Sequence, residues 1–278
     1  MKRRRAAAGG WVSAVVALAL GLSLAACSAT GPASVVGRQT LRIGVKANQP
    51  GLGQQLPDGR FVGFDVDVAR YIAAQLGVRP DQITFVPVTS ANREAALENG
   101  TVDMVIATYS ITPERETKVT FGGPYYVVHQ DTMVRAGDTA IRRVEDLKGK
   151  RLCQVTGSTS WERVTQELGI KAKLVPAASY SACVAMLRDG RVDAVSTDDL
   201  ILADFARAGT AVRIMNAPFS YERYGIGIRK GDVSGCEAVN RAVSQMYLDG
   251  TAAALLQKWF GKTGLQLDTH VPQFEGCG

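Results

Sequence analysis

The feature that most constrains this chain is a phrase that occurs twice, ninety residues apart. Residues 97–108 read Leu-Glu-Asn-Gly-Thr-Val-Asp-Met-Val-Ile-Ala-Thr, and residues 187–198 read Leu-Arg-Asp-Gly-Arg-Val-Asp-Ala-Val-Ser-Thr-Asp. Each copy has the pattern of a helix end, a glycine stop and a short buried strand. Although this pattern also arises by chance in helix–turn–strand units, two copies in register predict two similar α/β lobes.

Each predicted strand of the repeat ends at a polar residue, Thr108 in the first copy and Asp198 in the second. In open α/β sheets, ligands bind outside the carboxyl ends of the strands. The two strand ends therefore predict a ligand held in a cleft between the two lobes.

Alternating strand and helix patterns along the rest of the chain favour a mostly parallel sheet. Two extended segments, residues 129–134 and 224–228, are expected to cross between the lobes, so that the chain leaves the first lobe, builds the second and returns. The patterns predict strands at residues 41–45, 83–88, 102–107, 151–155, 172–175 and 192–196, and helices at residues 64–77, 93–99, 161–168, 180–188, 237–248 and 251–259.

Asp65 and Asp67 stand in the first turn of the helix expected at residues 64–77. Two carboxylates at this spacing also occur in paired-carboxylate sites. We interpret Asp65 as the cap of the helix and Asp67 as a solvated charge that suits the helix dipole.

The first 26 residues have the features of a signal peptide rather than of a folded element. A basic start, residues 2–5, precedes an apolar run at residues 11–24 that is short and rich in Gly and Ala for a spanning helix. The run ends in Leu-Ala-Ala-Cys27, which resembles the lipobox of bacterial lipoproteins. That resemblance implies cleavage before Cys27 and a lipid on its thiol; the alternative is a secreted protein cut at an A-x-A-like site.

Residues 27–39 are small and polar, and they are expected to form a flexible tether between the anchor and the folded part. The leader also explains much of the basic charge. The whole chain has a formal net charge of +6 from 32 basic and 26 acidic side chains, whereas 28 basic side chains remain after residue 26, giving +2. No Lys/Arg-rich stripe with interleaved aromatic residues occurs, so the sequence gives no support to nucleic-acid binding.

Four cysteines remain when Cys27 is set aside, and an even number outside the cytoplasm favours disulfides. Three pairings are possible. We favour Cys153–Cys183, which would lie within one lobe, and Cys236–Cys277, which would fasten the C-terminal tail. Buried free thiols are the alternative.

A metal site is a weaker interpretation of the same cysteines. No C-x-x-C occurs, and both histidines, His129 and His270, lie far in sequence from any cysteine. We therefore expect no metal and no cofactor.

Residues 108–115, Thr-Tyr-Ser-Ile-Thr-Pro-Glu-Arg, followed by Phe121, Pro124 and Tyr125, resemble family 3, the polar amino-acid family of extracytoplasmic solute-binding proteins that serve ABC importers. Other matching segments lie in the expected order over almost the whole mature chain. They are residues 41–45, 63–65 and 146–150 together with Asp193 and Asp198. Residues 46–53 look most like the glutamate-binding lipoproteins of this family.

The resemblance implies a fold class: α/β, with two lobes in the type II periplasmic-binding-protein-like arrangement, mostly parallel sheets and two crossover strands. The two extended segments expected to cross between the lobes give the lobe boundaries. The first lobe would comprise residues 40–130 and 224–278, and the second lobe residues 131–223.

The resemblance further implies a function: capture of one amino acid, L-glutamate or else L-aspartate, with no chemistry performed. The partners would be an ABC permease and its ATPase, and the protein would be a monomer held outside the cytoplasm, on the cell membrane, by its lipid. A receptor for glutamine or another polar amino acid, and a sensory receptor, are alternatives. A dehydratase or transglycosylase on the same scaffold is a weaker one, because no tuned acid/base stands out.

An amino acid brings an α-carboxylate and an α-ammonium, and burying either charge unpaired is costly, so the cleft must supply both signs. By resemblance, Arg115 grips the α-carboxylate and Asp198 receives the ammonium. Thr108 and Ser110 match the loop that offers polar groups to the same end of the ligand. The planar fork of arginine suits a carboxylate.

Ser158 and Thr159 follow Gly157 at the start of the helix expected at residues 161–168. Backbone N–H groups at a helix N-terminus suit an anion, so we expect both residues to contribute to the ligand site.

Three further residues bear on specificity. Many relatives carry an acidic residue where Lys46 stands, and relatives that bind acidic amino acids carry a basic residue at the position of Arg93, with Ser90 just before it. Counting Lys46, Arg93 and Arg115 against Asp198 gives the cleft a charge of +2. This charge favours glutamate, which brings −1, over glutamine.

Overall fold

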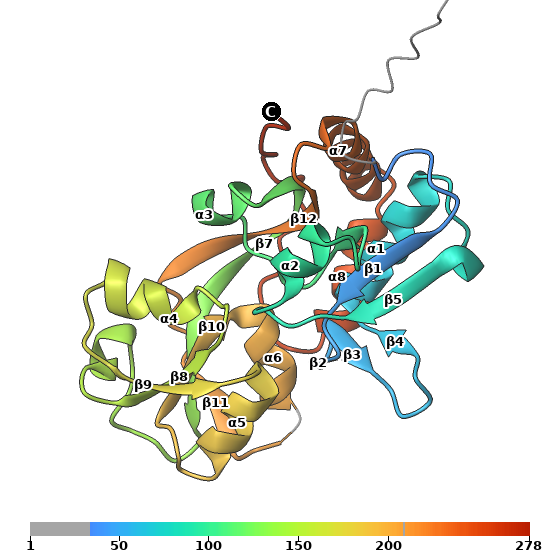
Figure 1. Ribbon diagram of the computed structural model, residues 1–278. Coiled ribbons are helices and arrows are strands. Elements are labelled where there is room, and N and C mark those ends of the chain that lie inside the picture. The colour runs from blue at the N-terminus through green and yellow to red at the C-terminus, as the bar shows by residue number, and fades with distance from the viewer. Residues whose placement is uncertain (1–33, 208) are drawn as a thin grey trace, which may run out of the picture. The chain divides into compact units, whose positions relative to one another are not determined.

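The structure is a computed structural model that describes residues 34–207 and 209–278 (Figure 1). The predicted signal peptide, residues 1–26, and the predicted lipidated Cys27 lie outside the described residues. Within the two described ranges, no helix is long and apolar enough to cross a membrane.

The end of the predicted tether belongs to the folded part. Val35 is buried, and its N–H donates to Asp232 at 2.9 Å, while Arg38 pairs with Asp103 at 3.0 Å. The expectation of a flexible tether up to residue 39 is therefore wrong for residues 34–39, because an apolar side chain and a basic side chain both find partners in the core.

The main sheet has nine strands, and β7 and β12 run through its centre. The strands are β1 (Leu41–Val45), β5 (Ile83–Pro87), β6 (Met104–Val105), β7 (Val119–Arg135), β8 (Arg151–Val155), β9 (Lys173–Ala177), β10 (Ala194–Asp198), β11 (Val212–Ile214) and β12 (Ser220–Arg229). Their order is β5-β1-β6-β12-β7-β10-β8-β9, with β11 paired to β7.

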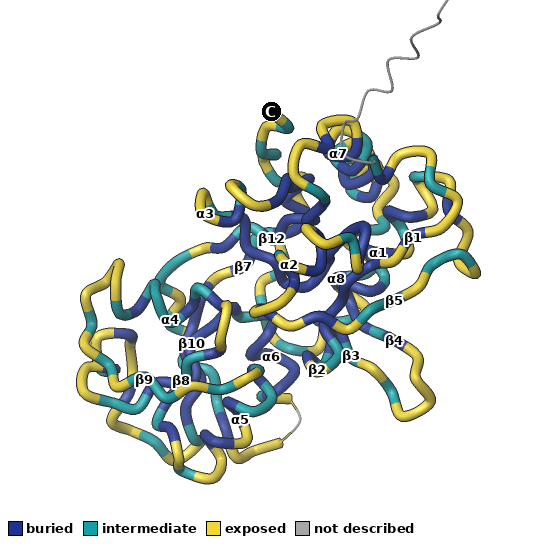
Figure 2. The backbone as a smooth tube through the Cα atoms, viewed as in Figure 1, coloured by how far each residue is buried: buried dark blue, intermediate teal, exposed yellow. Residues whose placement is uncertain are grey.

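Every antiparallel pair in this sheet involves β7 or β12, and all the other pairs are parallel. The two long strands pair with each other, from Ser220 opposite Gln130 to Arg229 opposite Val119. Both are buried along most of their length (Figure 2). The prediction of mostly parallel strands joined by two crossover strands is thus confirmed.

The crossover strands separate two lobes (Figure 1). One lobe holds β1, β5 and β6 with α1 (Phe64–Gln75), α2 (Arg93–Glu98), α3 (Pro113–Glu116), α7 (Val233–Leu248) and α8 (Thr251–Phe260). The other holds β8 to β11 with α4 (Ser160–Glu162), a π-helix (Arg163–Glu167), α5 (Tyr180–Arg188) and α6 (Asp199–Arg207). The point along β7 and β12 at which one lobe gives way to the other stays a prediction.

The sequence repeat has the same structural role in both lobes. Asp103 accepts hydrogen bonds from the backbone N–H of Arg42 at 2.8 Å and from its guanidinium at 2.9 and 3.2 Å. Asp193 binds Arg151 through the same three donors, at 2.8, 2.6 and 3.1 Å. Each aspartate thereby joins the start of its own strand to the neighbouring strand, which accounts for the repeated Val-Asp.

Asp65 does not cap α1, which corrects the sequence interpretation. Gly63 occupies the N-cap position, with no side-chain cap. Asp65 is fully buried, and its two oxygens accept hydrogen bonds from the N–H of Thr108 at 2.9 Å and the hydroxyl of Tyr125 at 2.7 Å. The carboxylate points into the protein because these two donors lie on the buried side of the helix.

Asp67 is not a solvated charge either. It accepts hydrogen bonds from Lys258 Nζ at 2.6 Å and Trp259 Nε1 at 2.9 Å. The ring of Phe260 lies 5.9 Å from that of Phe64 in an edge-on arrangement. These contacts hold α8 against α1.

Some elements were not predicted from the sequence. A small three-stranded sheet comprises β2 (Asn48–Gln49), β3 (Gly53–Gln55) and β4 (Phe61–Val62). Helices α3 and α6 and strand β11 were also missed, and the helix expected at residues 161–168 is the short α4 followed by a π-helical turn. Short 3₁₀ turns occur at Pro80–Gln82 and Val144–Leu147.

Both favoured disulfides are present, Cys153–Cys183 and Cys236–Cys277. The first lies within the second lobe and joins β8 to α5, while the second fastens the C-terminal tail to α7.

We expect the Cys153→Ala/Cys183→Ala double variant to lose about 3 kcal/mol of unfolding free energy, because the bond closes a loop of 30 residues and removes chain entropy from the unfolded state. Urea denaturation of the oxidised protein, with Cys236–Cys277 intact, measures this loss. A loss below about 1 kcal/mol would contradict the entropic account.

Candidate ligand-binding site

A small cavity lies between the lobes, beyond the ends of β6 and β10. The space open to a water-sized molecule is about 10 Å³, which is room for about one water. Its lining comprises Ser90, Arg93, Thr108, Ser110, Arg115, Ser158, Thr159, Ser160, Tyr180, Asp198 and Ile201. Eight of the nine residues predicted to bind the ligand are in this set.

The ninth predicted residue, Lys46, lines an adjoining pocket of about 90 Å³ that shares Ser90 and Tyr180 with the cavity. Lys46 Nζ donates a hydrogen bond to Ser90 Oγ at 2.7 Å. The structure therefore brings all nine predicted residues into one contiguous region, drawn from both lobes.

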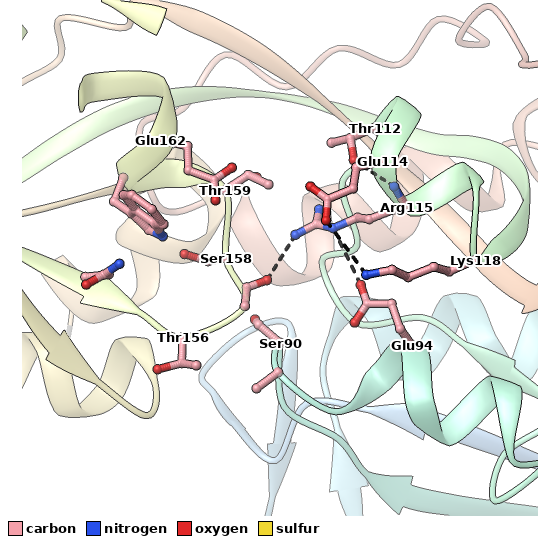
Figure 3. Close-up of a pocket in the computed structure, with 14 residues that line it drawn as sticks. Ser90, Glu94, Thr112, Glu114, Arg115, Lys118, Thr156, Ser158, Thr159 and Glu162 are labelled. Carbon is pink, nitrogen blue, oxygen red and sulfur yellow. Dashed lines mark hydrogen bonds and ion pairs between the residues drawn. The ribbon is translucent and has the colours of Figure 1, made fainter. Parts of the chain in front are cut away.

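Arg115 bridges the two lobes. Its Nη1 donates to the carbonyl of Ser110 at 2.8 Å, and its Nη2 donates across the cleft to the carbonyl of Gly157 at 3.1 Å (Figure 3). Thr112 places it, because the Thr112 hydroxyl accepts the N–H of Arg115 and caps α3, whose first residue is a proline. The guanidinium is thus fixed at the mouth of the cavity.

Arg93 is the first residue of α2, and its side chain is only 2% exposed. Its Nη1 donates to the carbonyls of Ala107 and Thr108 at 3.1 and 3.3 Å, and its guanidinium lies 3.9 Å from the centre of the Tyr109 ring. Burial and the nearby charge of Arg115 lower the pKa of Arg93 to about 10. Arg93 therefore remains a buried cation at neutral pH.

Lys46 is also buried. Burial, followed by the charges of Arg93 and Arg115, lowers the pKa of Lys46 well below its usual value, while Asp65 and Glu94 oppose that shift. A bound anion near this ammonium would favour its charged form.

Thr108 has a left-handed backbone conformation, with φ of 46°. Its N–H is held by Asp65 at 2.9 Å, and its Oγ1 donates to Gln49 Oε1 at 3.1 Å. Because Asp65 anchors the Thr108 amide, the chain can turn at the end of β6 and direct the Ala107 and Thr108 carbonyls to Arg93. Neither Asp65 nor Gln49 was assigned to the site from the sequence.

One carboxylate oxygen of Asp198 accepts a hydrogen bond, and the other has no partner in the described part of the chain. The hydroxyl of Tyr224 donates to its Oδ2 at 2.7 Å, whereas its buried Oδ1 has no hydrogen-bond partner in the described part of the chain. Burial, and then the charge of Glu222, raise the pKa of Asp198 to about 8. A buried acceptor of this kind suits an ammonium donor, since buried polar atoms rarely lack partners.

The expected anion site at the start of α4 is only partly available. Thr159 occupies the N-cap position, but the N–H of Ser158 already donates to the carbonyl of Val155 at 3.1 Å. Ser158 therefore cannot offer that N–H to a ligand without breaking a turn. Its hydroxyl remains among the groups that line the cavity.

The charge of the site differs from the value of +2 predicted from the sequence. The structure adds two buried or partly buried carboxylates, Asp65 and Glu94, to the four groups counted there. Three basic groups then face three acidic ones, and the formal sum is zero. In the described part of the chain, no cluster of three or more His, Cys, Asp or Glu side chains is arranged to hold a metal ion.

Comparison with known proteins gives the family. Residues 41–262 match the bacterial extracellular solute-binding proteins, family 3. The chain belongs to this family. It is 38% identical over 272 residues to the glutamate-binding protein GluB of Corynebacterium efficiens, across 92% of each chain.

Two further proteins that are similar to this chain are described as binding glutamine, and one of them is named as an arginine-binding protein. The chain is 30% identical over 261 residues to the ABC transporter glutamine-binding protein GlnH of Bacillus subtilis, across 88% of this chain and 95% of that protein. It also matches a solved structure of an ancestral arginine-binding protein bound to glutamine, with a TM-score of 0.73 and 38% identity, over 81% of this chain and 99% of that one. The two-lobed fold of the family is thus confirmed.

We expect Asp198→Asn to flatten the pH dependence of stability. Because the pKa of Asp198 is raised in the folded protein, the folded state binds more protons than the unfolded state between about pH 4 and 8, and stability falls as pH rises through this range. The asparagine variant removes up to about 1.4 kcal/mol per pH unit of that fall.

Urea denaturation of ligand-free protein at several pH values measures the slope. The exposed Asp189→Asn variant serves as the control for loss of a surface carboxylate. Equal slopes in the wild type and Asp198→Asn would show that Asp198 is already ionised in this range.

Proposed function

We propose that this protein is the binding component of an ABC importer and that it captures L-glutamate between its lobes. The observation that carries the proposal is the arrangement of charges in one buried region. Three basic side chains, Lys46, Arg93 and Arg115, lie on the first lobe, and Asp198 on the second lobe presents an oxygen with no hydrogen-bond partner in the described part of the chain. This arrangement suits a small molecule with two carboxylates and one ammonium.

In the proposed complex, Arg115 binds the α-carboxylate and Asp198 Oδ1 accepts the α-ammonium. Arg93 and Lys46 face the side-chain carboxylate, with hydroxyls from Ser90, Thr108, Ser110, Ser158 and Thr159 supplying further hydrogen bonds. Charge-assisted hydrogen bonds of this kind are stronger than neutral ones.

Binding requires the lobes to move. The cavity has room for about one water, far less than an amino acid needs. Arg115 also holds the carbonyl of Gly157 across the cleft, and this contact has to open when the ligand enters. The ligand then favours the closed form because it touches both lobes only there.

The relatives support the same ligand class. The chain shares 38% identity with a glutamate-binding protein across most of its length, against 30% with a glutamine-binding one. L-aspartate is the next candidate because it carries the same charges on a shorter side chain. Glutamine is the alternative that the zero formal charge of the site favours.

The remaining parts of the proposal follow from the sequence and the family. We propose a lipid anchor at Cys27, a monomer, lobes divided at residues 130/131 and 223/224, and delivery of ligand to a permease and ATPase. A purely binding role is proposed because Asp198, a buried cleft carboxyl whose pKa is raised, is assigned to the ligand ammonium. A membrane kinase in place of a permease would make the protein a sensory receptor.

A thermal-shift panel of the twenty amino acids tests the function. We expect the largest rise in Tm with glutamate, because a ligand that binds only the folded state stabilises it by mass action. Arg115→Ala should abolish that rise, and the exposed Arg143→Ala should preserve it. A largest rise with arginine or lysine would contradict the proposal.

We expect Lys46→Met to lower the preference for glutamate over glutamine by roughly 10- to 100-fold, because the variant removes one charge-assisted hydrogen bond to the side-chain carboxylate. The dissociation constants of both ligands, measured by calorimetry, give this ratio. An unchanged ratio would place Lys46 outside the side-chain site.

A further inference from the structure

Glu94 lies between the two arginines of the site and has no role in the proposed binding of the ligand. A single oxygen, its Oε1, lies 3.6 Å from Arg115 Nε and 3.7 Å from Arg93 Nε. The same oxygen accepts a hydrogen bond from the hydroxyl of Tyr109 at 2.8 Å. The Tyr109 ring in turn lies beneath the Arg93 guanidinium, so these four side chains form one compact cluster.

The cluster stands at the boundary of two spaces. Arg93 and Arg115 line the inner cavity, whereas Glu94 and Arg115 line an outer pocket of about 420 Å³ between the lobes (Figure 3). The side chain of Glu94 is 18% exposed, against 2% for Arg93 and 8% for Arg115. Glu94 therefore places a negative charge within 4 Å of the two arginines that line the inner cavity.

We propose that Glu94 is a specificity-determining residue, whose charge offsets one of the three buried cations and limits the preference of the site for a dicarboxylic amino acid over its neutral amide. The proposal rests on the proposed function. In this proposal Glu94 alters the preference between glutamate and glutamine without contacting the ligand.

The charge balance of the site supports this role. Asp65 is committed to Thr108 and Tyr125, and Asp198 faces the position of the ligand ammonium. Among the described residues, Glu94 is the acidic side chain that lies within 4 Å of both arginines. Removing its charge changes the formal sum from zero to +1, which strengthens the attraction for glutamate and leaves that for the uncharged side chain of glutamine nearly unaltered.

Glu94→Gln is a close test because the amide oxygen of glutamine can still accept the Tyr109 hydroxyl. Both ligands carry the same α-groups, so the ratio of their affinities isolates the side-chain charge. The measurement is made at pH 6 for the wild type and every variant. Glu94 opposes the lowering of the Lys46 pKa, and a lower pH favours the charged form of Lys46 whether or not Glu94 is present.

Calorimetry at pH 6 gives the dissociation constants of glutamate and glutamine for the wild type and each variant. We expect the glutamate-to-glutamine affinity ratio to rise about tenfold in Glu94→Gln, as for one added charge in a partly screened site. Glu94→Ala should raise the ratio in the same direction, and Glu94→Asp, which keeps the charge, should hold it near the wild-type value.

Glu114→Gln is the matched control. Glu114 lines the same outer pocket, but its side chain is 82% exposed and pairs with Lys118, so its variant should leave the ratio within about twofold, since exposed ion pairs are weak. A ratio that is unchanged or lower in both Glu94→Gln and Glu94→Ala, in protein that binds glutamate, overturns the role of Glu94 alone. Wild-type protein that binds neither ligand overturns the proposed function and this proposal with it.

Discussion

Burying two guanidinium groups side by side is the constraint on which the site depends. Arg93 and Arg115 are almost completely removed from solvent, and an unpaired buried cation is costly. Hydrogen bonds from the two guanidinium groups to backbone carbonyls of the segment after β6 offset this cost. That segment turns at Thr108, which has a left-handed backbone conformation. The conformation of that loop is therefore what places its carbonyl groups against the two buried guanidinium groups.

The crossover strands hold a carboxylate of the site in each lobe. Tyr125 of β7 holds Asp65 in the first lobe, and Tyr224 of β12 holds Asp198 in the second. The two tyrosine rings lie 5.9 Å apart. Each lobe thus presents a carboxylate fixed by a tyrosine from a strand that both lobes share, and Asp198 keeps one oxygen free for a ligand.

The sequence predicted the features that depend on local pattern. The repeat, with its glycine stops and Val-Asp pairs, predicted both lobes. The even cysteine count favoured disulfides, and the places of the cysteines in the predicted lobe and tail favoured the two pairs that form. The sequence did not indicate that Asp65 and Glu94 lie at the site. A carboxylate in the first turn of a helix is also stabilised by solvent and by the helix dipole, so its position alone does not predict burial. Their burial depends on donors distant in sequence, Tyr125 and Tyr109, and β2 to β4 are too short to show a period.

The central claim is that Arg115 and Asp198 bind the two ends of one amino acid between the lobes. A crystal structure of the protein grown with L-glutamate tests it most directly. The account predicts the α-carboxylate on the Arg115 guanidinium, the ammonium on Asp198 Oδ1, and the side-chain carboxylate toward Arg93 and Lys46. A ligand bound elsewhere, or Arg115 and Asp198 turned away from it, would contradict the account.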